Sequence, residues 1–236
     1  MLGMSRRSEQ LMEMYRAMLG RFGHQAWWPG DTPLEICVGA ILTQNTNWKN
    51  VEKALANLKA AACLTVSALH ARPVEQLAEL IRPAGYYNIK AGRLRNFIVH
   101  VWRYYESRGI EPDRSAGELD AFFDRPLSTL REELLSVSGI GRETADSILL
   151  YAGGKCTFVV DTYTYRILLR HQMIAPEDDY EAIKELMESA LPQDRELWND
   201  YHAQLVSTGK EFCRPTPRCD GCPLQPFPHD IRTCEP

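Results

Sequence analysis

The sequence lacks any apolar run long enough to span a membrane. Its first residues mix apolar and charged side chains and lack the apolar core of a signal peptide, so we expect a cytoplasmic protein without a membrane partner. Strand-like segments are scarce as well, because the apolar run at residues 157–160 is too short to found a sheet. These absences exclude membrane and secreted proteins and predict an all-α fold.

An excess of basic charge is also missing. The 236 residues contain 27 Lys and Arg against 31 Asp and Glu, which gives a formal net charge of -4. This balance argues weakly against nucleic-acid binding, although a local basic face would be sufficient for it. Hydrophobic residues at 44% and charged residues at 25% are typical of a folded globular protein. The length fits one large domain or two small ones.

Helical periodicity of apolar residues recurs along most of the chain. It predicts helices over residues 34–42, 51–58, 74–81, 91–105, 116–123, 163–169, 180–190 and 196–210.

One stretch has the pattern of two short helices joined by a glycine turn. Apolar residues at helical spacing lead to Gly139-Ile140-Gly141, and a second helical pattern continues to Ala152. Backbone amides at the start of the second helix would suit an anion, because glycines let another backbone approach closely. Asp161 follows the apolar run at residues 157–160, which places an acid after this hairpin. The competing interpretation is an ordinary helical hairpin with a solvated Asp.

Two further stretches combine aromatic and polar side chains. Trp27 and Trp28 precede the first strong helix, and Trp48 closes a polar run that includes Gln44. Such groups suit stacking on bases and hydrogen bonding to them, although core packing and helix capping explain the same residues. Lys90 lies at a Gly-Tyr-Tyr turn, a setting typical of phosphate contacts and equally of a plain loop.

Four of the seven cysteines crowd the end of the chain, namely Cys213, Cys219, Cys222 and Cys234. The intervals between them contain five, two and eleven residues. Clustered thiols in a chain without a secretion signal indicate metal binding rather than disulfides. Four thiolates suit either tetrahedral zinc or a [4Fe–4S] cluster, and the spacing does not decide between them.

Taken together, these motifs resemble the helix-hairpin-helix DNA glycosylases of the endonuclease III superfamily. The resemblance extends from about residue 25 to residue 234, and each motif is in the family's order. The matching stretches are residues 42–46, 85–91, 137–145 and 159–162, together with the cysteine loop.

The resemblance implies two helical lobes with DNA held at the cleft between them. A six-helix barrel would occupy residues 29–155 and include the hairpin at residues 134–152. The second lobe would combine residues 1–28 with residues 156–236 and contain the cysteine loop at residues 213–234. The implied partner is double-stranded DNA that contains a damaged base, bound by a monomer at the bacterial or archaeal nucleoid.

Roles are implied by position within the matching motifs. The amides of Gly139 and Gly141 would hold a DNA phosphate, and Arg142 and Lys90 would add contacts to DNA. Gln44 matches the glutamine that fills the gap left by a flipped nucleotide. Asp161 matches the catalytic aspartate, whose carboxylate would stabilise positive charge that develops on the sugar.

The sharpest departure from the family pattern is Glu143. Bifunctional members have a lysine at this hairpin position, and that lysine attacks the sugar through a Schiff base. Glutamate cannot do so, and we therefore expect a monofunctional enzyme that uses water and has no lyase activity on abasic sites. Within the superfamily the chain is most similar to endonuclease III-like 3-methyladenine glycosylases. This implies a base pocket for alkylated purines, formed by Trp27, Trp28, Trp48 and Glu143.

The family also implies a [4Fe–4S] cluster on the cysteine loop. Cys213, Cys219 and Cys222 match three ligands, whereas the spacing to Cys234 is longer than usual and leaves the role of Cys234 open. Two alternative functions stay open at this point. One is excision of oxidised pyrimidines or mismatched bases with lyase activity, and the other is a non-catalytic module that binds damaged DNA.

Overall fold

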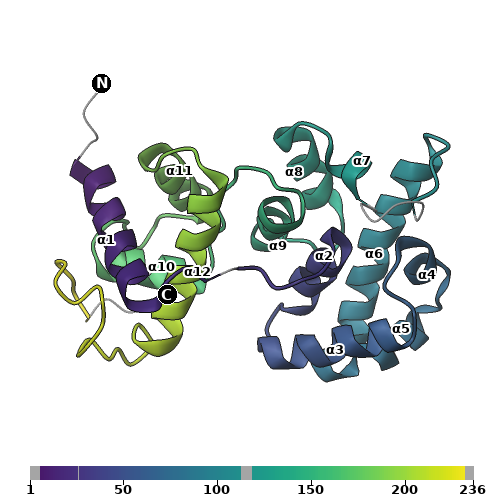
Figure 1. Cartoon of the computed structure of the whole chain (residues 1–236), viewed down its shortest axis with the longest axis horizontal. Helices are drawn as coiled ribbons and strands as arrows, with labels where there is room; N and C mark the ends of the chain where they lie inside the picture. The colour runs from purple at the N-terminus through teal and green to yellow at the C-terminus, as the bar shows by residue number, and fades with distance from the viewer. Residues whose placement is uncertain (1–5, 26, 113–118, 232–236) are drawn as a thin grey trace. The chain divides into compact units, whose positions relative to one another are not determined.

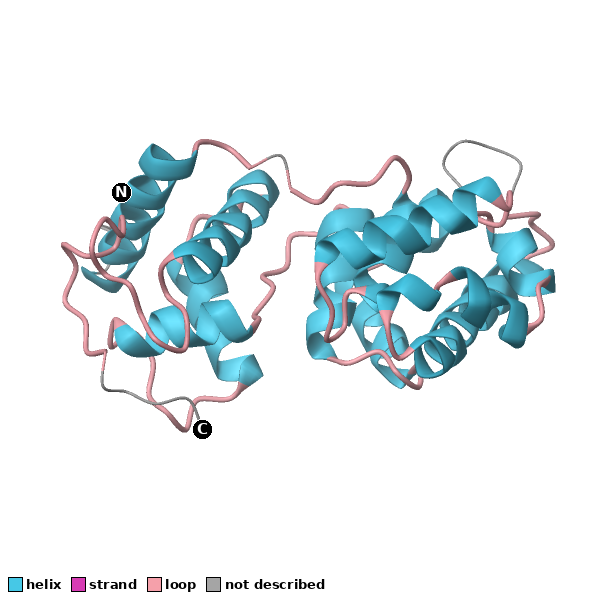
Figure 2. Cartoon of the chain, turned by 90° about the horizontal axis from the view of Figure 1, so that it is seen from below, coloured by secondary structure: helices cyan, strands magenta, loops and turns pink. Residues whose placement is uncertain are grey.

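The computed structural model describes residues 6–25, 27–112 and 119–231. The chain forms two compact units (Figure 1). We call Trp28–Lys155 the hairpin unit, and Met1–Trp27 together with Cys156–Pro236 the cysteine-loop unit. No β-strand occurs in the described ranges, as Figure 2 shows, which confirms the all-α prediction. Within the same ranges no helix is both long and apolar enough to cross a membrane.

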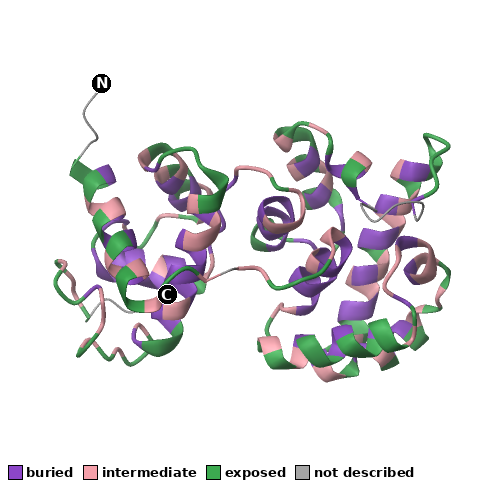
Figure 3. Cartoon of the chain, in the orientation of Figure 1, coloured by how far each residue is buried: buried purple, intermediate pink, exposed green. Residues whose placement is uncertain are grey.

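The hairpin unit is built around α2 (Pro33–Leu42), which is buried on nearly all sides (Figure 3). Helices α3, α6 and α9 and the π-helical turn η2 all pack against it. The remaining elements form the rest of this unit: α3 (Trp48–Ala60), α4 (Val66–Ala71), α5 (Val74–Leu80), the 3-10 turn η1 (Arg82–Ala84), α6 (Tyr87–Glu106), α7 (Asp120–Phe123), α8 (Leu127–Ser136), α9 (Arg142–Ser147) and η2 (Ile148–Ala152).

The cysteine-loop unit has its own hydrophobic core. It contains α1 (Arg6–Phe22), α10 (Thr162–Arg170), α11 (Tyr180–Ala190) and α12 (Arg195–Glu211). Helix α12 packs against both α1 and α10. Tyr201 of α12 connects this helix to α1, because its hydroxyl donates to the Leu11 carbonyl at 2.8 Å and its ring stacks on Tyr15.

Short polar side chains begin six of the described α-helices. The side chains of Thr32, Asp161, Asp179 and Asp194 each accept a hydrogen bond from a backbone amide in the first turn of the following helix. Such caps satisfy amides that the helix itself leaves without acceptors. Helices α5 to α9 lack a side-chain cap, and two of them, α6 and α9, begin at segments expected to touch DNA.

Two local features differ from the sequence-based expectation. The second helix of the hairpin changes from α to π geometry over Ile148–Ala152, because the Gly153 amide bonds to the Ile148 carbonyl five residues back. Helix α4 (Val66–Ala71) is not among the predicted helices, and with six residues it is too short for apolar periodicity to mark it.

Candidate active site

The glycine turn between α8 and α9 depends on Gly139. Its φ of +97° lies in the region that disfavours any side chain, and a methyl group there would overlap the side chain of Arg93 on α6. Asn96, also on α6, donates to the Ser138 carbonyl at 3.0 Å. The hairpin turn is therefore seated on α6 rather than being a free loop.

Gln44 is tied to the same turn. Its side-chain amide nitrogen donates to the Gly139 carbonyl at 3.2 Å and to the Thr144 hydroxyl at 2.9 Å. Its side-chain oxygen accepts a hydrogen bond from the Arg93 guanidinium. The structure thus brings the predicted Gln44 and Gly139 together and adds Arg93 and Thr144, which sequence reasoning missed.

The first turn of α9 presents the remaining hairpin residues. Gly141 is the N-cap of α9 and has a φ of -92°, so its backbone would accept other residues, and nothing lies within 4 Å of a methyl group placed on it. Arg142 and Glu143 follow and are exposed. Asp146 on the buried side pairs with Arg131 of α8 at 2.9 Å, which braces the two helices against each other.

Lys90, predicted to contact DNA, is buried in the structure. Its side chain is buried, with a relative exposure of 1%, and its ammonium donates to the carbonyls of Leu42 at 2.9 Å and Ala84 at 2.8 Å. Burial lowers its pKa to about 8. The expectation of a phosphate contact is corrected accordingly: Lys90 holds the end of α2 to the turn before α6.

Tyr86 and Ile89 are exposed apolar side chains at the same turn. Tyr86 is 70% exposed and Ile89 is 57% exposed. Tyr86 also has a φ of +47°, a left-handed conformation that is unusual for a bulky residue. The sequence signal was the Gly-Tyr-Tyr turn, but only the backbone conformation shows which tyrosine faces solvent.

Two of the predicted pocket tryptophans meet in the hairpin unit. The centroids of the Trp28 and Trp48 rings lie 5.2 Å apart in an edge-to-face arrangement, and the Tyr151 ring is tilted against Trp28 at a centroid distance of 5.2 Å. Gly39 of α2 lies beneath them, because a methyl group there would lie 3.3 Å from the Trp28 indole nitrogen. Tyr151 was missed because it belongs to the π-helical turn, which the sequence pattern does not distinguish from a regular helix.

Trp27 separates from this aromatic group and belongs to the cysteine-loop unit. The ammonium of Lys210 on α12 lies 5.5 Å from its ring centroid, at cation–π distance. Trp27 also lines a pocket with acidic residues of α12 and its N-cap, including Asp194 and Asp200.

Asp161 begins α10 as its N-cap. Its Oδ1 accepts hydrogen bonds from the Thr164 amide at 2.7 Å and the Thr164 hydroxyl at 2.9 Å, and its Oδ2 lies 3.6 Å from Nε2 of His202 on α12. Burial alone raises the pKa of this carboxyl, but His202 and the two bonds from Thr164 outweigh burial and hold the pKa below its usual value. The structure therefore offers a fixed, ionised carboxylate at this position.

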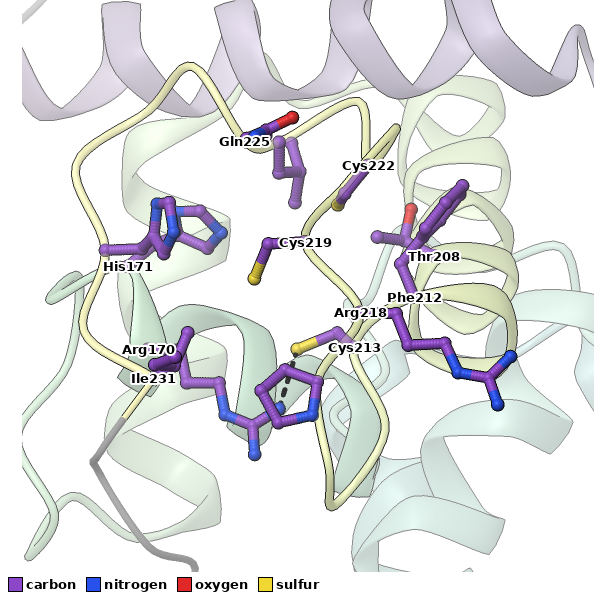
Figure 4. Close-up of a pocket in the computed structure, with 13 residues that line it drawn as sticks. Arg170, His171, Thr208, Phe212, Cys213, Arg218, Cys219, Cys222, Gln225 and Ile231 are labelled. Atoms are coloured by element: carbon purple, nitrogen blue, oxygen red, sulfur yellow. Dashed lines mark hydrogen bonds between the residues drawn. The ribbon is translucent and has the colours of Figure 1, made fainter.

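The cysteine loop follows α12 and folds back on α10. Cys213, Cys219 and Cys222 line one pocket with Arg170 and His171 (Figure 4). The Arg170 guanidinium donates to the Cys213 sulfur at 3.2 Å, and Arg166 donates to the Cys213 carbonyl at 3.1 Å. Burial raises the pKa of the Cys213 thiol, and the nearby guanidinium of Arg170 works in the opposite direction.

The donor set of this pocket suits a thiolate-bound cluster. Three thiols line the same pocket, and the Arg170 guanidinium beside Cys213 would offset negative charge on the thiolates. In the part of the chain that the structure describes, no three His, Cys, Asp or Glu side chains converge closely enough to hold a single metal ion. Cys234 lies outside the described residues.

Comparison with known proteins places these features in context. Residues 38–193 match the HhH-GPD superfamily of base excision DNA repair proteins. The chain is 45% identical to a protein of Methanocaldococcus jannaschii named provisionally as a DNA repair glycosylase, over 93% of the chain and 96% of that relative. It is 31% identical to endonuclease III of Thermotoga maritima, over 82% of the chain and 81% of that enzyme.

Solved structures share the fold. The H. pylori 3-methyladenine DNA glycosylase, solved with 1,N6-ethenoadenine, superposes with a TM-score of 0.69 at 27% identity and covers 87% of this chain and 97% of its own. A non-covalent endonuclease III–DNA complex superposes with a TM-score of 0.75 at 22% identity and covers 96% and 95%.

Proposed function

The chain belongs to the HhH-GPD superfamily of base excision DNA repair proteins, and we propose that it is a monofunctional DNA glycosylase. In this proposal the protein flips a damaged base out of duplex DNA and hydrolyses the bond between that base and its sugar. Two observations carry the proposal together: the carboxylate of Asp161 is anchored, and an acid, Glu143, occupies the hairpin position where bifunctional members have a lysine.

Asp161 supplies what hydrolysis of this bond needs. Positive charge develops on the sugar as the base departs, and a fixed carboxylate stabilises that charge and orients water. The lowered pKa of Asp161 keeps it ionised at neutral pH. Its two bonds from Thr164 hold the carboxylate in one orientation, so little reorganisation is required when the charge appears.

The side chains at the hairpin and the buried lysines do not support attack of a lysine on the sugar. Glu143 cannot form a Schiff base with the sugar. The two buried lysines are committed to structural bonds: Lys90 to the carbonyls of Leu42 and Ala84, and Lys184 to the Phe158 carbonyl and to Glu188. The proposal is therefore hydrolysis by Asp161 and water, which leaves an intact abasic site.

The proposed substrate is an alkylated purine such as 3-methyladenine. Trp28, Trp48 and Tyr151 form an aromatic group, and alkylated bases that carry positive charge interact favourably with the faces of such rings. The likeness to the H. pylori 3-methyladenine glycosylase supports the same class of base.

DNA would be held by the hairpin unit. Backbone amides at Gly139 and Gly141 and the side chain of Arg142 would contact a phosphate. Gln44 would exchange its bonds with Gly139 and Thr144 for bonds within the duplex. The exposed side chains of Tyr86 and Ile89 at the start of α6 have the apolar character of residues that wedge between bases.

A [4Fe–4S] cluster on the cysteine loop completes the proposal. Cys213, Cys219 and Cys222 would ligate it, and Cys234 is the fourth thiol available in the sequence. When bound, the cluster would cross-link the loop through iron–thiolate bonds. Arg166 and Arg170 already tie this loop to α10, the helix that begins at Asp161.

The experiment that tests the activity replaces Asp161 with Asn. Asparagine is nearly isosteric and is itself a good N-cap, so α10 should still form. We expect release of 3-methyladenine from alkylated duplex DNA to fall at least ~100-fold, since a carboxylate acting on the reaction contributes on that order. DNA binding should persist. The matched control is Asp179→Asn, which changes another N-cap of the same unit, and its activity should match the wild type.

Two outcomes would contradict the proposal. Unchanged base release by Asp161→Asn would remove Asp161 from the reaction. A covalent protein–DNA adduct trapped by borohydride would mean that a lysine attacks the sugar, as expected for the endonuclease III-like alternative, and would shift the assignment to that chemistry.

A further inference from the structure

His202 and Asp161 form a buried pair that joins α12 to the start of α10. The two side chains are 5% and 11% exposed, and His202 Nε2 lies 3.6 Å from Asp161 Oδ2. The other carboxylate oxygen, Oδ1, is already occupied by the amide and hydroxyl of Thr164. Each oxygen of Asp161 therefore faces its own partner, and of these two described partners His202 is the one that can carry a positive charge.

We propose that His202 is a positioning residue of the reaction, which as an imidazolium keeps Asp161 ionised and directs its Oδ2. The inference rests on the proposed function, because it assigns His202 a role only through Asp161. His202 is too deeply buried to touch DNA itself, so it acts on the carboxylate and not on the substrate.

The surroundings of Asp161 explain why such a cation is needed. An isolated buried carboxylate favours its protonated form, because burial removes the water that stabilises the charge. Thr164 donates as a neutral group. Arg166, the nearest guanidinium on α10, donates to the Cys213 carbonyl and lies 5.7 Å from the Tyr163 ring. Tyr163 is itself a neutral neighbour, since burial and the charge of Asp161 raise its pKa.

The remaining neighbour is the apolar segment before Asp161. Its Val160 amide faces the hydroxyl of Tyr180 on α11 at 3.5 Å. Two charged side chains of α11 bind the other end of this segment: Lys184 donates to the Phe158 carbonyl, and Glu188 accepts from the Phe158 amide, so the two charges oppose each other there. His202 is thus the group on which ionisation of Asp161 depends. An imidazolium also opposes charge on the sugar slightly, but without it the carboxyl would take up a proton at a higher pH, and the protonated form stabilises no such charge.

The test compares pH profiles of base release under single-turnover conditions. In the wild type, release should stay flat from neutral pH down to about pH 5, because Asp161 remains ionised across this range. In His202→Gln the acid limb should move to higher pH by roughly 1 to 3 units, as expected when a carboxylate loses a nearby cation. Release on the plateau above that limb, and DNA binding, should stay within a few-fold of the wild type.

A matched control exists in the hairpin unit. His100 pairs with Glu133 at 3.3 Å, and neither residue belongs to the proposed site. His100→Gln should leave the pH profile unchanged. If His202→Gln only damaged the structure, it would lower base release equally at every pH and leave the acid limb in place. An acid limb that does not move in His202→Gln would overturn the inference.

A second measurement is independent of how His202→Gln folds. Nuclear magnetic resonance of the imidazole nitrogens should show His202 as an imidazolium at neutral pH in the wild type, and as a neutral ring in Asp161→Asn. A neutral His202 in the wild type at neutral pH would overturn the inference. The two hypotheses fail separately: active Asp161→Asn refutes the proposed function, whereas inactive Asp161→Asn with an unmoved limb in His202→Gln refutes only the role of His202.

Discussion

Gly139 and Gly141 look alike in the sequence, but their surroundings impose different demands. Gly139 has a φ of +97°, and a methyl group there would lie 3.0 Å from Arg93 Cβ and closer still to Cγ. Gly141 has an ordinary φ of -92° and open space around it. Gly139 is therefore required by the fold, whereas the open space at Gly141 is consistent with the proposed approach of a phosphate.

We expect the two alanine substitutions to separate these requirements. Gly139→Ala should lower the free energy of unfolding by about 1–2 kcal/mol from left-handed strain alone, measured by denaturant titration. Gly141→Ala should change stability by less than about 0.5 kcal/mol, but should weaken DNA binding measured by fluorescence anisotropy, because the methyl group occupies space meant for a phosphate. Unchanged DNA binding by Gly141→Ala would argue against close backbone approach at the turn.

At the scale of elements, α10 and α12 determine where Asp161 lies. Tyr163, two residues after Asp161, packs its side chain onto Gly209 of α12, and His202 of α12 faces Asp161. The absence of a side chain at Gly209 lets the two helices approach each other closely. The same approach brings His202 to the carboxylate.

Gly209→Ala should therefore destabilise the protein although alanine favours helices. The better helix propensity of alanine contributes up to ~1 kcal/mol, but the new methyl group would lie 2.8 Å from Tyr163 Cβ and Cγ. Overpacking of this kind costs about 1–3 kcal/mol, so the net effect should be a lower melting temperature and reduced base release.

The control for this substitution is Gly92→Ala in α6. No atom lies within 4 Å of a methyl group at Gly92, so the propensity gain should appear alone and raise the melting temperature. If both substitutions raise it equally, the contact between Tyr163 and Gly209 does not limit the packing of α10 on α12.

At the scale of the whole molecule, the two units have separate cores, and the cysteine loop belongs to only one of them. The loop is joined to α10 by Arg166 and Arg170, and its described residues, 213–231, form no helix. Its order should therefore depend on a bound group more than the hairpin unit does.

Purified protein should show broad visible absorbance and contain iron and acid-labile sulfide in equal amounts. Cys219→Ser should lose both and unfold at a lower temperature, because iron–thiolate bonds that stabilise the folded loop are gone. Cys156→Ser, in the same unit but outside the loop, should retain them. A colourless protein that contains zinc would contradict the iron–sulfur assignment.

The sequence predicted the helical architecture well where local signals were strong. The expected helix at residues 180–190 coincides with α11, since Asp179 marks its start and apolar residues repeat along one face. Helix α4 and the π geometry of η2 were not predicted, because a helix of one or two turns leaves too short a pattern. The sequence alone also showed which residue types occur at the hairpin and in the cysteine loop. It showed in addition that Glu143 occupies the position at which bifunctional members have a lysine.

Only the tertiary structure decided which side chains face one another. Lys90 carries the same charge whether it is exposed or buried, so its bonds to Leu42 and Ala84 had no sequence signal. His202 lies 41 positions beyond Asp161 (202 - 161), and no local pattern records a contact made by packing α12 on α10. The sequence by itself determined the fold class and supplied the candidates for the reacting groups, because both depend on residue type and short-range spacing. The ionisation of Asp161, the aromatic partner Tyr151 and the tie between Gln44 and the hairpin were decided by tertiary structure, because they depend on long-range contacts and burial.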